Sequence, residues 1–216
     1  MSATTAKSSR RSENRRFRRQ QLISATTKCI SKWGISGTTM ANVASEAGLS
    51  QGIVNLHFQT KDNLLSQALQ FLADEYKELF ERTLRKSGPT ASDKLLALMQ
   101  LDFKPSVCDR QKLAVWFAFW GEAKSVPTYQ KICAEHDIGY DDAVTDLCEQ
   151  IIREGAYAGV TAAQVTDALS SMTDGLWLSC LIHPKTWNRH AAMSAVYSYL
   201  QSVFPAHYPI KGEAGN

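Results

Sequence analysis

The segment TMANVASEAGLSQGIVNLHF, residues 39–58, constrains the fold more than any other part of the chain. Its Ala44, Gly48 and Val54 have the spacing of two short helices joined by a tight turn. A small Ala44 lets the helices approach closely, and Gly48 can adopt the left-handed conformation that the turn needs. Val54 would then pack the second helix back on the first. We expect a helix-turn-helix here, with an ordinary helical hairpin as the alternative.

The outward side of the second helix would present polar residues at positions that could reach DNA. Gln51 and Asn55 can each form paired hydrogen bonds with an adenine edge, and Gly52 would let the backbone come close to the duplex. Residues 1–62 hold ten Lys or Arg and three Asp or Glu, a net charge of +7, whereas residues 63–216 have a net charge of −4. A basic end on a mildly acidic body favours DNA binding over a merely solvated hairpin.

Apolar residues recur at helical spacing through the rest of the chain, and no convincing alternating strand pattern occurs. We therefore predict an all-α fold of about nine helices. The helix-turn-helix region would be joined by one long helix to a C-terminal helical bundle. The predicted divisions are a disordered basic arm (1–14), the DNA-binding domain (15–60), the helical bundle (61–205), to which the family resemblance described below assigns ligand binding and dimerisation, and a flexible tail (206–216).

Composition and motifs exclude several functional classes. The five cysteines are scattered and never form a C-x-x-C, which indicates reduced thiols in a cytoplasm and no disulfide or zinc site. No apolar run approaches the roughly 20 residues of a membrane span, and the polar N-terminus does not resemble a secretory signal. Nucleotide-binding loops, hydrolase elbows and metal-ligand spacings do not occur. We expect no enzyme activity, catalytic residue, metal, cofactor or membrane contact.

The N-terminal third resembles the DNA-binding domain of TetR-family transcriptional repressors. The resemblance lies in RRQQLISAT and in GISGTTMANVASEAGLSQGIVNLHFQTKDNLLSQAL, and it covers about residues 15–70. It implies a three-helix DNA-binding domain, a fourth connecting helix, and a divergent C-terminal bundle that dimerises and binds an inducer. In one position the chain departs from the family: Leu56 stands where an aromatic residue is more frequent.

The resemblance also implies which residues contact operator DNA. The positions that match DNA-contacting ones are Thr39, Ser50, Gln51, Asn55, His57 and Lys61. Thr39 and Ser50 would stand at helix N-termini, which favour phosphate, and Lys61 can neutralise a phosphate charge. Three arginines at the start of the first helix, Arg16, Arg18 and Arg19, could do the same.

Two helices near the C-terminus have apolar stripes that suit a dimer interface. They are predicted from Thr161 to about Ile182 and from Thr186 to Phe204. Four such helices from two chains would form a two-fold interface, as in the resembled family. Packing within one chain is the alternative. A dimer would place two reading helices about 34 Å apart, the separation of successive major grooves.

The segment AVWFAFWGEA, residues 114–123, places Trp116, Phe119 and Trp120 on one helix face. Asp174 and Trp177 lie three residues apart farther along the chain. A quaternary ammonium group has charge but no N–H donor, so proteins hold it with aromatic faces and a nearby carboxylate. An ordinary packed core is the alternative. The candidate ligand-binding residues are Trp116, Phe119, Trp120, Glu122, Tyr129, Asp174 and Trp177.

The segments AVWFAFWGEA and TDGLWL resemble the C-terminal domain of BetI-type repressors, the choline-responsive members of the TetR family. This resemblance implies a homodimer that binds a palindromic operator in double-stranded DNA. Choline or a similar quaternary ammonium inducer would release it and so derepress genes for choline uptake and glycine betaine synthesis. A TetR-type regulator that responds to another hydrophobic or cationic small molecule is the alternative, and a scaffold that no longer binds DNA is a further one.

Overall fold

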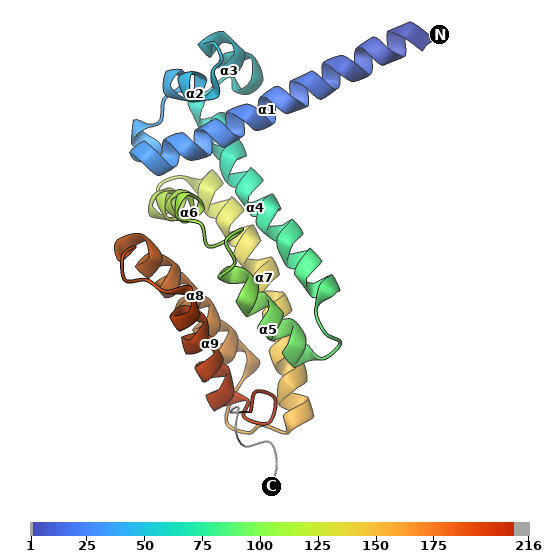
Figure 1. Ribbon diagram of the computed structural model, residues 1–216, viewed down its shortest axis with the longest axis vertical. Helices are drawn as coiled ribbons and strands as arrows, with labels where there is room; N and C mark the ends of the chain where they lie inside the picture. The colour runs from blue at the N-terminus through green and yellow to red at the C-terminus, as the bar shows by residue number, and fades with distance from the viewer. Residues whose placement is uncertain (1, 210–216) are drawn as a thin grey trace. The chain divides into compact units, whose positions relative to one another are not determined.

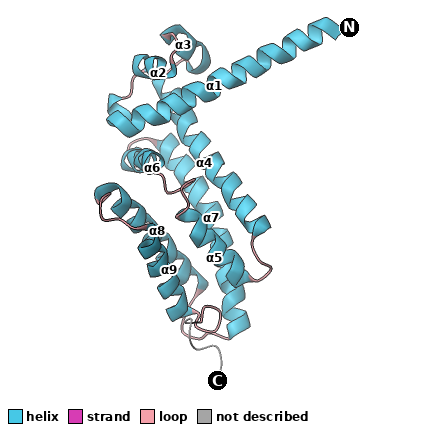
Figure 2. Ribbon diagram, in the orientation of Figure 1, coloured by secondary structure: helices cyan, strands magenta, loops and turns pink. Residues whose placement is uncertain are grey.

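The computed structural model describes residues 2–209, and within that range the chain is built from helices without strands (Figure 2). This confirms the all-α prediction. Within the same range nine helices follow one another (Figure 1): α1 (Ser2–Gly37), α2 (Met40–Ala47), α3 (Gln51–Phe58), α4 (Lys61–Lys86), α5 (Ala91–Asp102), α6 (Arg110–Ala123), α7 (Pro127–Gly155), α8 (Ala162–Ile182) and α9 (Arg189–Val203).

The chain divides into two compact units. The first extends to Leu72 and includes Ala114–Ile132, and the second comprises Ala73–Leu113 with the chain from Cys133 onward. The boundary between these units falls after Leu72 and not after residue 60, where the sequence predicted a domain boundary, because the beginning of α4 packs into the core of the first unit. Leu64 and Ala68 of α4 are buried in the same hydrophobic cluster as residues of α1, α2 and α3.

The first three helices pack together around this cluster, and Figure 1 shows α2 and α3 beside the second half of α1. The cluster contains Leu22, Ile23, Ala25, Cys29, Val43, Ala44, Ala47, Val54 and Phe58. At the surface, Glu46 of α2 pairs with Lys28 at 3.6 Å and with Lys32 at 2.9 Å, both on α1. Gln21 of α1 also donates to the Ala47 carbonyl at 2.7 Å. These contacts fix α2 against α1.

The turn between α2 and α3 has the predicted geometry. Gly48 ends α2 in the left-handed conformation (φ 64°, ψ 33°), and its N–H donates to the carbonyls of Ala44 and Ser45. Leu49 N–H also donates to the Ala44 carbonyl, at 2.9 Å. Val54 is fully buried, so α3 packs back on the cluster as expected. The helix-turn-helix is therefore set by Gly48 at the turn and by the burial of Val54.

The first helix differs from its prediction at the N-terminal end. The sequence predicts a disordered arm over residues 1–14, whereas α1 begins at Ser2. Extending an existing helix costs far less than starting one, and the segment contains no proline that would stop the extension. The predicted end is observed, because Gly34 leaves the helical conformation (φ 69°, ψ 179°) and a last turn to Gly37 follows this kink.

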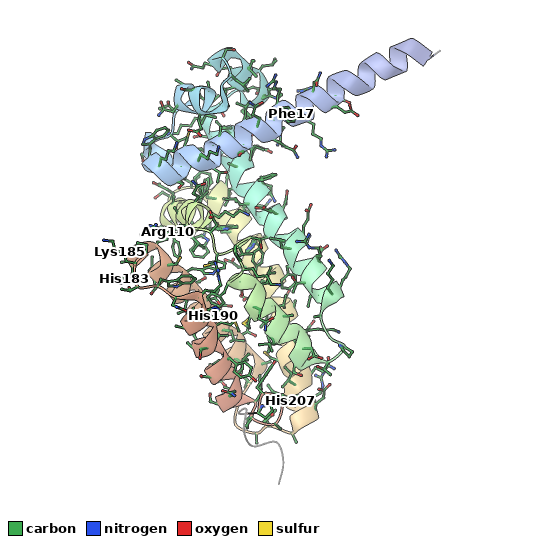
Figure 3. The ribbon with its side chains drawn as sticks, viewed as in Figure 1. Phe17, Arg110, His183, Lys185, His190 and His207 are labelled. Atoms are coloured by element: carbon green, nitrogen blue, oxygen red, sulfur yellow. The ribbon has the colours of Figure 1, made fainter. Side chains whose placement is uncertain are left out.

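Capping residues set the ends of the helices in the second unit. Thr90 caps α5 and Thr161 caps α8, each in a reciprocal pair with the side chain three residues later. The ninth helix starts at Arg189, three residues after the predicted start, because Asn188 caps it and the preceding residues form a turn. His183, Lys185 and His190, labelled in Figure 3, lie around this turn.

The second unit is closed by its C-terminal residues. Tyr208 donates to the Ser92 carbonyl at 2.9 Å and so fastens the end of α9 to the start of α5. His207, labelled in Figure 3, bonds the Tyr157 hydroxyl at 3.0 Å. Of the predicted tail, residues 210–216 lie outside the described part of the chain. Within residues 2–209, no helix combines the length and the apolar character that a membrane span requires.

We predict that Gly48→Ala lowers the free energy of unfolding by about 1 kcal/mol, because a Cβ is strained at this left-handed φ. Gly52→Ala is the matched control, since Gly52 lies inside α3 where alanine is favoured, and its added Cβ would meet only Ser50 Oγ at 3.8 Å. Urea denaturation monitored by circular dichroism measures both variants. Equal stability of the two variants would contradict the assigned role of Gly48.

Candidate DNA-binding face and candidate ligand site

One face of α3 is exposed and lies opposite its buried residues. Val54 and Phe58 are buried in the core of the first unit. The exposed residues recur at helical spacing on the other side: Gln51, Gly52, Asn55, Leu56 and Gln59. We call this set the α3 face. It has hydrogen-bonding amides at Gln51 and Asn55 and an uncovered backbone at Gly52, the residue types that major-groove recognition uses.

Two predicted phosphate-binding hydroxyls stand at helix N-termini. Thr39 caps α2, and its hydroxyl oxygen accepts from Asn42 N–H at 3.1 Å. Ser50 precedes α3 in an extended conformation, and its hydroxyl makes no capping hydrogen bond to that helix. Free amide groups at both N-termini attract anions, and the Ser50 hydroxyl can add a further donor.

The basic residues predicted to contact DNA differ in the contacts that they make within the protein. Lys61 donates to the Ser36 carbonyl at 3.3 Å, at the first turn of α4. Arg16 is exposed, and Arg18 donates to Gln21 at 2.8 Å along the surface of α1. Arg19 lies over the Phe58 ring, 5.8 Å from its centroid, and bonds Gln67. Arg19 therefore stabilises the packing of α1 on α3 and α4 in addition to supplying charge.

His57 has a lowered pKa, because it is partly removed from water and because Arg15 and Arg19 repel a positive charge on its ring. Its ring lies 6.2 Å from the Phe58 ring. At neutral pH the imidazole is therefore uncharged and has one donor and one acceptor nitrogen. Such a ring can hydrogen-bond a phosphate or a base edge without adding to the charge of the face.

The aromatic segment of α6 belongs to the first unit. Phe119 is fully buried and packs edge-on against Tyr129 of α7, with ring centroids 4.8 Å apart. Trp116 is buried and its ring lies 6.2 Å from that of half-buried Trp120. Glu122 is half-buried. The pKa of Tyr129 is raised, first by burial and then by the negative charges of Asp62 and Glu122. Five of the seven predicted ligand residues thus share one unit, whereas Asp174 and Trp177 belong to the other.

A buried carboxylate lies at the centre of the second unit. Asp102, at the end of α5, is 1% exposed. Tyr76 of α4 donates to its Oδ1 at 2.6 Å, and Tyr140 of α7 donates to its Oδ2 at 3.1 Å. Trp177 of α8 donates from Nε1 to the Asp102 backbone carbonyl at 2.9 Å. Four helices therefore meet at one acidic residue. We call Asp102, Tyr76, Tyr140 and Trp177 together the Asp102 cluster.

Within the described residues, the groups that act most strongly on the Asp102 carboxyl include no cation. Burial raises the pKa of Asp102 to about 7, although the hydrogen bonds from Tyr76 and Tyr140 favour its ionised form. Asp174 adds to the increase. Asp174 itself lies at the surface of α8, and partial desolvation with repulsion from Asp137 and Asp141 raises its pKa to about 6. The cluster is thus acidic, and a positive charge there would be stabilised.

Aromatic rings gather around Tyr76, whose hydroxyl bonds the carboxylate. The Tyr76 ring lies 4.8 Å from the His136 ring, 6.3 Å from Tyr140 and 6.4 Å from Phe80. Burial and the Asp102 charge raise the pKa values of Tyr76 and Tyr140 well above the ordinary range, so both hydroxyls remain donors. The Thr173 hydroxyl, one turn before Trp177, is buried and makes no hydrogen bond within the described residues. Aromatic faces, a carboxylate and a spare hydroxyl suit a small organic cation with a polar group.

Trp177 is among the ligand residues predicted from the sequence, whereas Tyr76 and Asp102 are not. Asp102 follows the apolar run LLALMQL, and an acidic residue at the end of a buried stripe is a signal that could have drawn attention. Tyr76 continues the buried stripe of Leu65, Leu69 and Leu72 along α4, so its spacing indicates only a core position. Only the packing of the second unit brings the two side chains together.

Comparison with known families gives matches to both parts of the chain. The family model for bacterial regulatory proteins of the tetR family matches residues 22–68. The model for the C-terminal part of BetI-type transcriptional repressors matches residues 91–205. The HTH-type transcriptional regulator BetI of Stenotrophomonas maltophilia (strain R551-3) is 31% identical over 183 residues, which cover 85% of this chain and 91% of that protein.

Solved structures of bacterial regulators have the same fold. A transcriptional regulator from Pseudomonas aeruginosa PAO1 superposes with a TM-score of 0.77 and 26% identity, covering 88% of this chain and 91% of the other. A transcriptional regulator from Saccharomonospora viridis, solved in complex with choline, has a TM-score of 0.75 and 19% identity, covering 85% of this chain and 95% of the other. At that identity, the second likeness concerns the fold alone.

We predict that Asp102→Asn makes stability less dependent on pH. The folded-state pKa of Asp102 is raised to about 7, so ionisation of this residue destabilises the folded protein progressively as pH rises from about 4 to 7. Relative to wild type, the variant should therefore gain about 2 kcal/mol between pH 5 and pH 7.5. Urea denaturation at both pH values measures the difference, and Asp146→Asn, at an exposed position of α7, controls for the lost charge. Parallel wild-type and Asp102→Asn profiles would refute the assignment.

Proposed function

Because the chain belongs to the TetR family of bacterial transcriptional regulators, and to its BetI-type branch, we propose that it is a choline-responsive repressor. A homodimer would bind a palindromic operator in the cytoplasm and leave it when choline or a related quaternary amine binds. The genes controlled would be those for choline uptake and glycine betaine synthesis. The chain is a regulator and not an enzyme, in common with its relatives.

The observation that carries the ligand proposal is the Asp102 cluster. Its buried carboxylate is held by two tyrosine hydroxyls and lies among aromatic rings. Burial of this acid is costly unless a cation offsets its charge, so a bound quaternary ammonium group would favour the ionised form. The aromatic faces would contact its methyl groups. The Thr173 hydroxyl lacks a hydrogen-bond partner in the described residues and could pair with the hydroxyl of choline.

The seven ligand residues predicted from the sequence form two groups in this proposal. Trp177 joins the Asp102 cluster through its hydrogen bond, and Asp174 adds negative charge nearby. Trp116, Phe119, Trp120, Glu122 and Tyr129 form the second group. The ring contact between Phe119 and Tyr129 also supports the alternative, in which this group is packed core.

The DNA part of the proposal rests on the α3 face and the groups beside it. Gln51 and Asn55 would bond base edges, with His57 beside them, while Thr39, Ser50 and Lys61 would bind phosphates. Arg16, Arg18 and Arg19 would add positive charge from α1. Exposure of both amides of α3 on a basic surface supports this assignment.

The dimer interface would be formed by α8 and α9. Leu178 is 41% exposed and Ile182 is 59% exposed, one turn apart on the same side of α8. On α9 the exposed side contains small residues, Ala191, Ser194, Ala195 and Ser198, which allow close approach of another helix. Burial of these apolar side chains in a two-fold pair would stabilise the dimer and fix the spacing of two α3 helices.

Helix α4 provides a physical route between the two functions. Its first turn contains Lys61 and its middle contains Tyr76, which bonds Asp102. A cation bound beside Asp102 would keep this acid ionised, change the Tyr76 contact and so favour a different position of this helix. The effect on DNA binding can be no larger than the difference in ligand affinity between the two arrangements.

We predict that choline lowers the affinity of the wild-type protein for its operator, and that Asp102→Asn requires at least roughly 30-fold more choline for the same effect, because a buried charge partner is lost. Without choline the variant should still bind the operator. A gel-shift titration of DNA from upstream of choline oxidation genes measures both. The uncharged tert-butyl analogue of choline is the control, and a response to it equal to the response to choline would exclude recognition of the cation.

The alternative function is a TetR-type regulator for another cationic or hydrophobic compound. The acidic character of the Asp102 cluster favours a cation. Thermal-shift measurements with a panel of quaternary amines, primary amines and neutral lipids distinguish these ligands. Stabilisation by a neutral compound alone would replace the choline proposal, while the regulatory role would remain.

We predict that Lys61→Ala and Gln51→Ala have different effects on DNA binding. Lys61→Ala should weaken binding to all duplexes and reduce the slope of log affinity against log salt by about 1 for each subunit, because a phosphate contact is lost. Gln51→Ala should weaken operator binding by about 1 to 3 kcal/mol and leave random DNA unaffected. Fluorescence anisotropy at several salt concentrations measures both. Equal losses on operator and random DNA for Gln51→Ala would disprove its role in base recognition.

A further inference from the structure

Leu56 is a large apolar residue that lies at the surface, outside the hydrophobic core. Its side chain is 75% exposed, the highest value among the exposed large apolar side chains of the described residues. The other large apolar side chains of α3 are buried in the core or packed against it, as Val54, Phe58 and Ile53 are. Leu56 instead lies on the α3 face, beside Asn55.

The surroundings of Leu56 within α3 leave this side chain uncovered. A helical side chain leans toward the turn that precedes it, and four residues earlier that turn contains Gly52. Gly52 has no side chain, and a Cβ placed there would meet only Ser50 Oγ at 3.8 Å. The leucine and the glycine therefore form an apolar strip beside the amides of Gln51 and Asn55.

The chemistry of the major groove limits what such a patch can recognise. Donor and acceptor atoms cover most of the base edges there, and the C5-methyl of thymine is the apolar group that they present. Polar atoms of the groove would gain nothing from an aliphatic side chain. A neighbouring Asn55 that bonds an adenine would also place Leu56 over A·T pairs, since each such pair has a thymine methyl.

We propose that Leu56 is a specificity-determining residue that recognises a thymine by contact with its methyl group, within the A·T part of each operator half-site. This inference rests on the proposed DNA-binding function and adds the base that the apolar part of the α3 face selects. A contact of Leu56 with deoxyribose would instead be independent of sequence. A docking surface for another protein would not respond to bases at all.

The test uses thymines from which only the methyl group has been removed. A duplex is first selected from a random-sequence library with the wild-type protein, and each thymine is then replaced by deoxyuridine. We expect one position in each half-site at which the replacement weakens wild-type binding about fourfold, the equivalent of one buried methyl group. Leu56→Ala should bind the unmodified duplex more weakly, and the same replacement should then cause no further loss.

Two further variants make the result specific. Leu56→Met keeps an apolar side chain and should retain the sensitivity to deoxyuridine. Phe71→Ala removes another exposed apolar side chain, on α4, and should behave as wild type. Alanine and leucine have similar helix propensities, so Leu56→Ala should keep the wild-type circular dichroism spectrum.

The outcomes separate this inference from the function on which it rests. Equal deoxyuridine effects in wild type and Leu56→Ala would overturn the thymine contact while leaving DNA binding intact. Equal losses of Leu56→Ala on selected and random duplexes would replace it with a sugar contact. Failure of the wild-type protein to enrich any sequence would overturn the DNA-binding proposal, and the thymine contact with it.

Discussion

The hydrogen bond between Tyr76 and Asp102 ties α4 to the centre of the second unit, and the same helix contributes Leu64 and Ala68 to the core of the first. Helix α4 therefore satisfies two sets of packing constraints along one continuous backbone. The two sets of contacts are therefore linked through the backbone of α4.

The Asp102 cluster is costly by the standards of a protein core. An apolar side chain of similar volume would avoid desolvation of the carboxylate, and burial raises the pKa of Asp102 to about 7. The two tyrosine hydroxyls offset part of that cost. A residue that destabilises its own fold at neutral pH is typical of a functional site, where a ligand supplies the missing interaction.

The two functional regions differ in how they depend on the sequence. In the α3 face, all exposed residues lie within nine consecutive positions, so helical periodicity alone predicted which of them share a side. The Asp102 cluster draws on α4, α5, α7 and α8, and Tyr76 and Trp177 are separated by about a hundred positions. The sequence pattern marked Trp177 as a candidate ligand residue, and it did not single out Tyr76 or Asp102. It could not indicate that three hydrogen-bond donors would converge on one acidic residue.

By itself, the sequence determined the all-α class, the turn at Gly48 and the exposure of Gln51, Gly52 and Asn55 on α3, because capping, glycine conformation and helical spacing act over a few residues. It also predicted the family, which the comparisons confirmed. The tertiary structure alone decided that Asp102 is buried and bonded by Tyr76 and Tyr140. Those contacts depend on how separate helices pack, and such packing is set by the whole core and not by any local pattern.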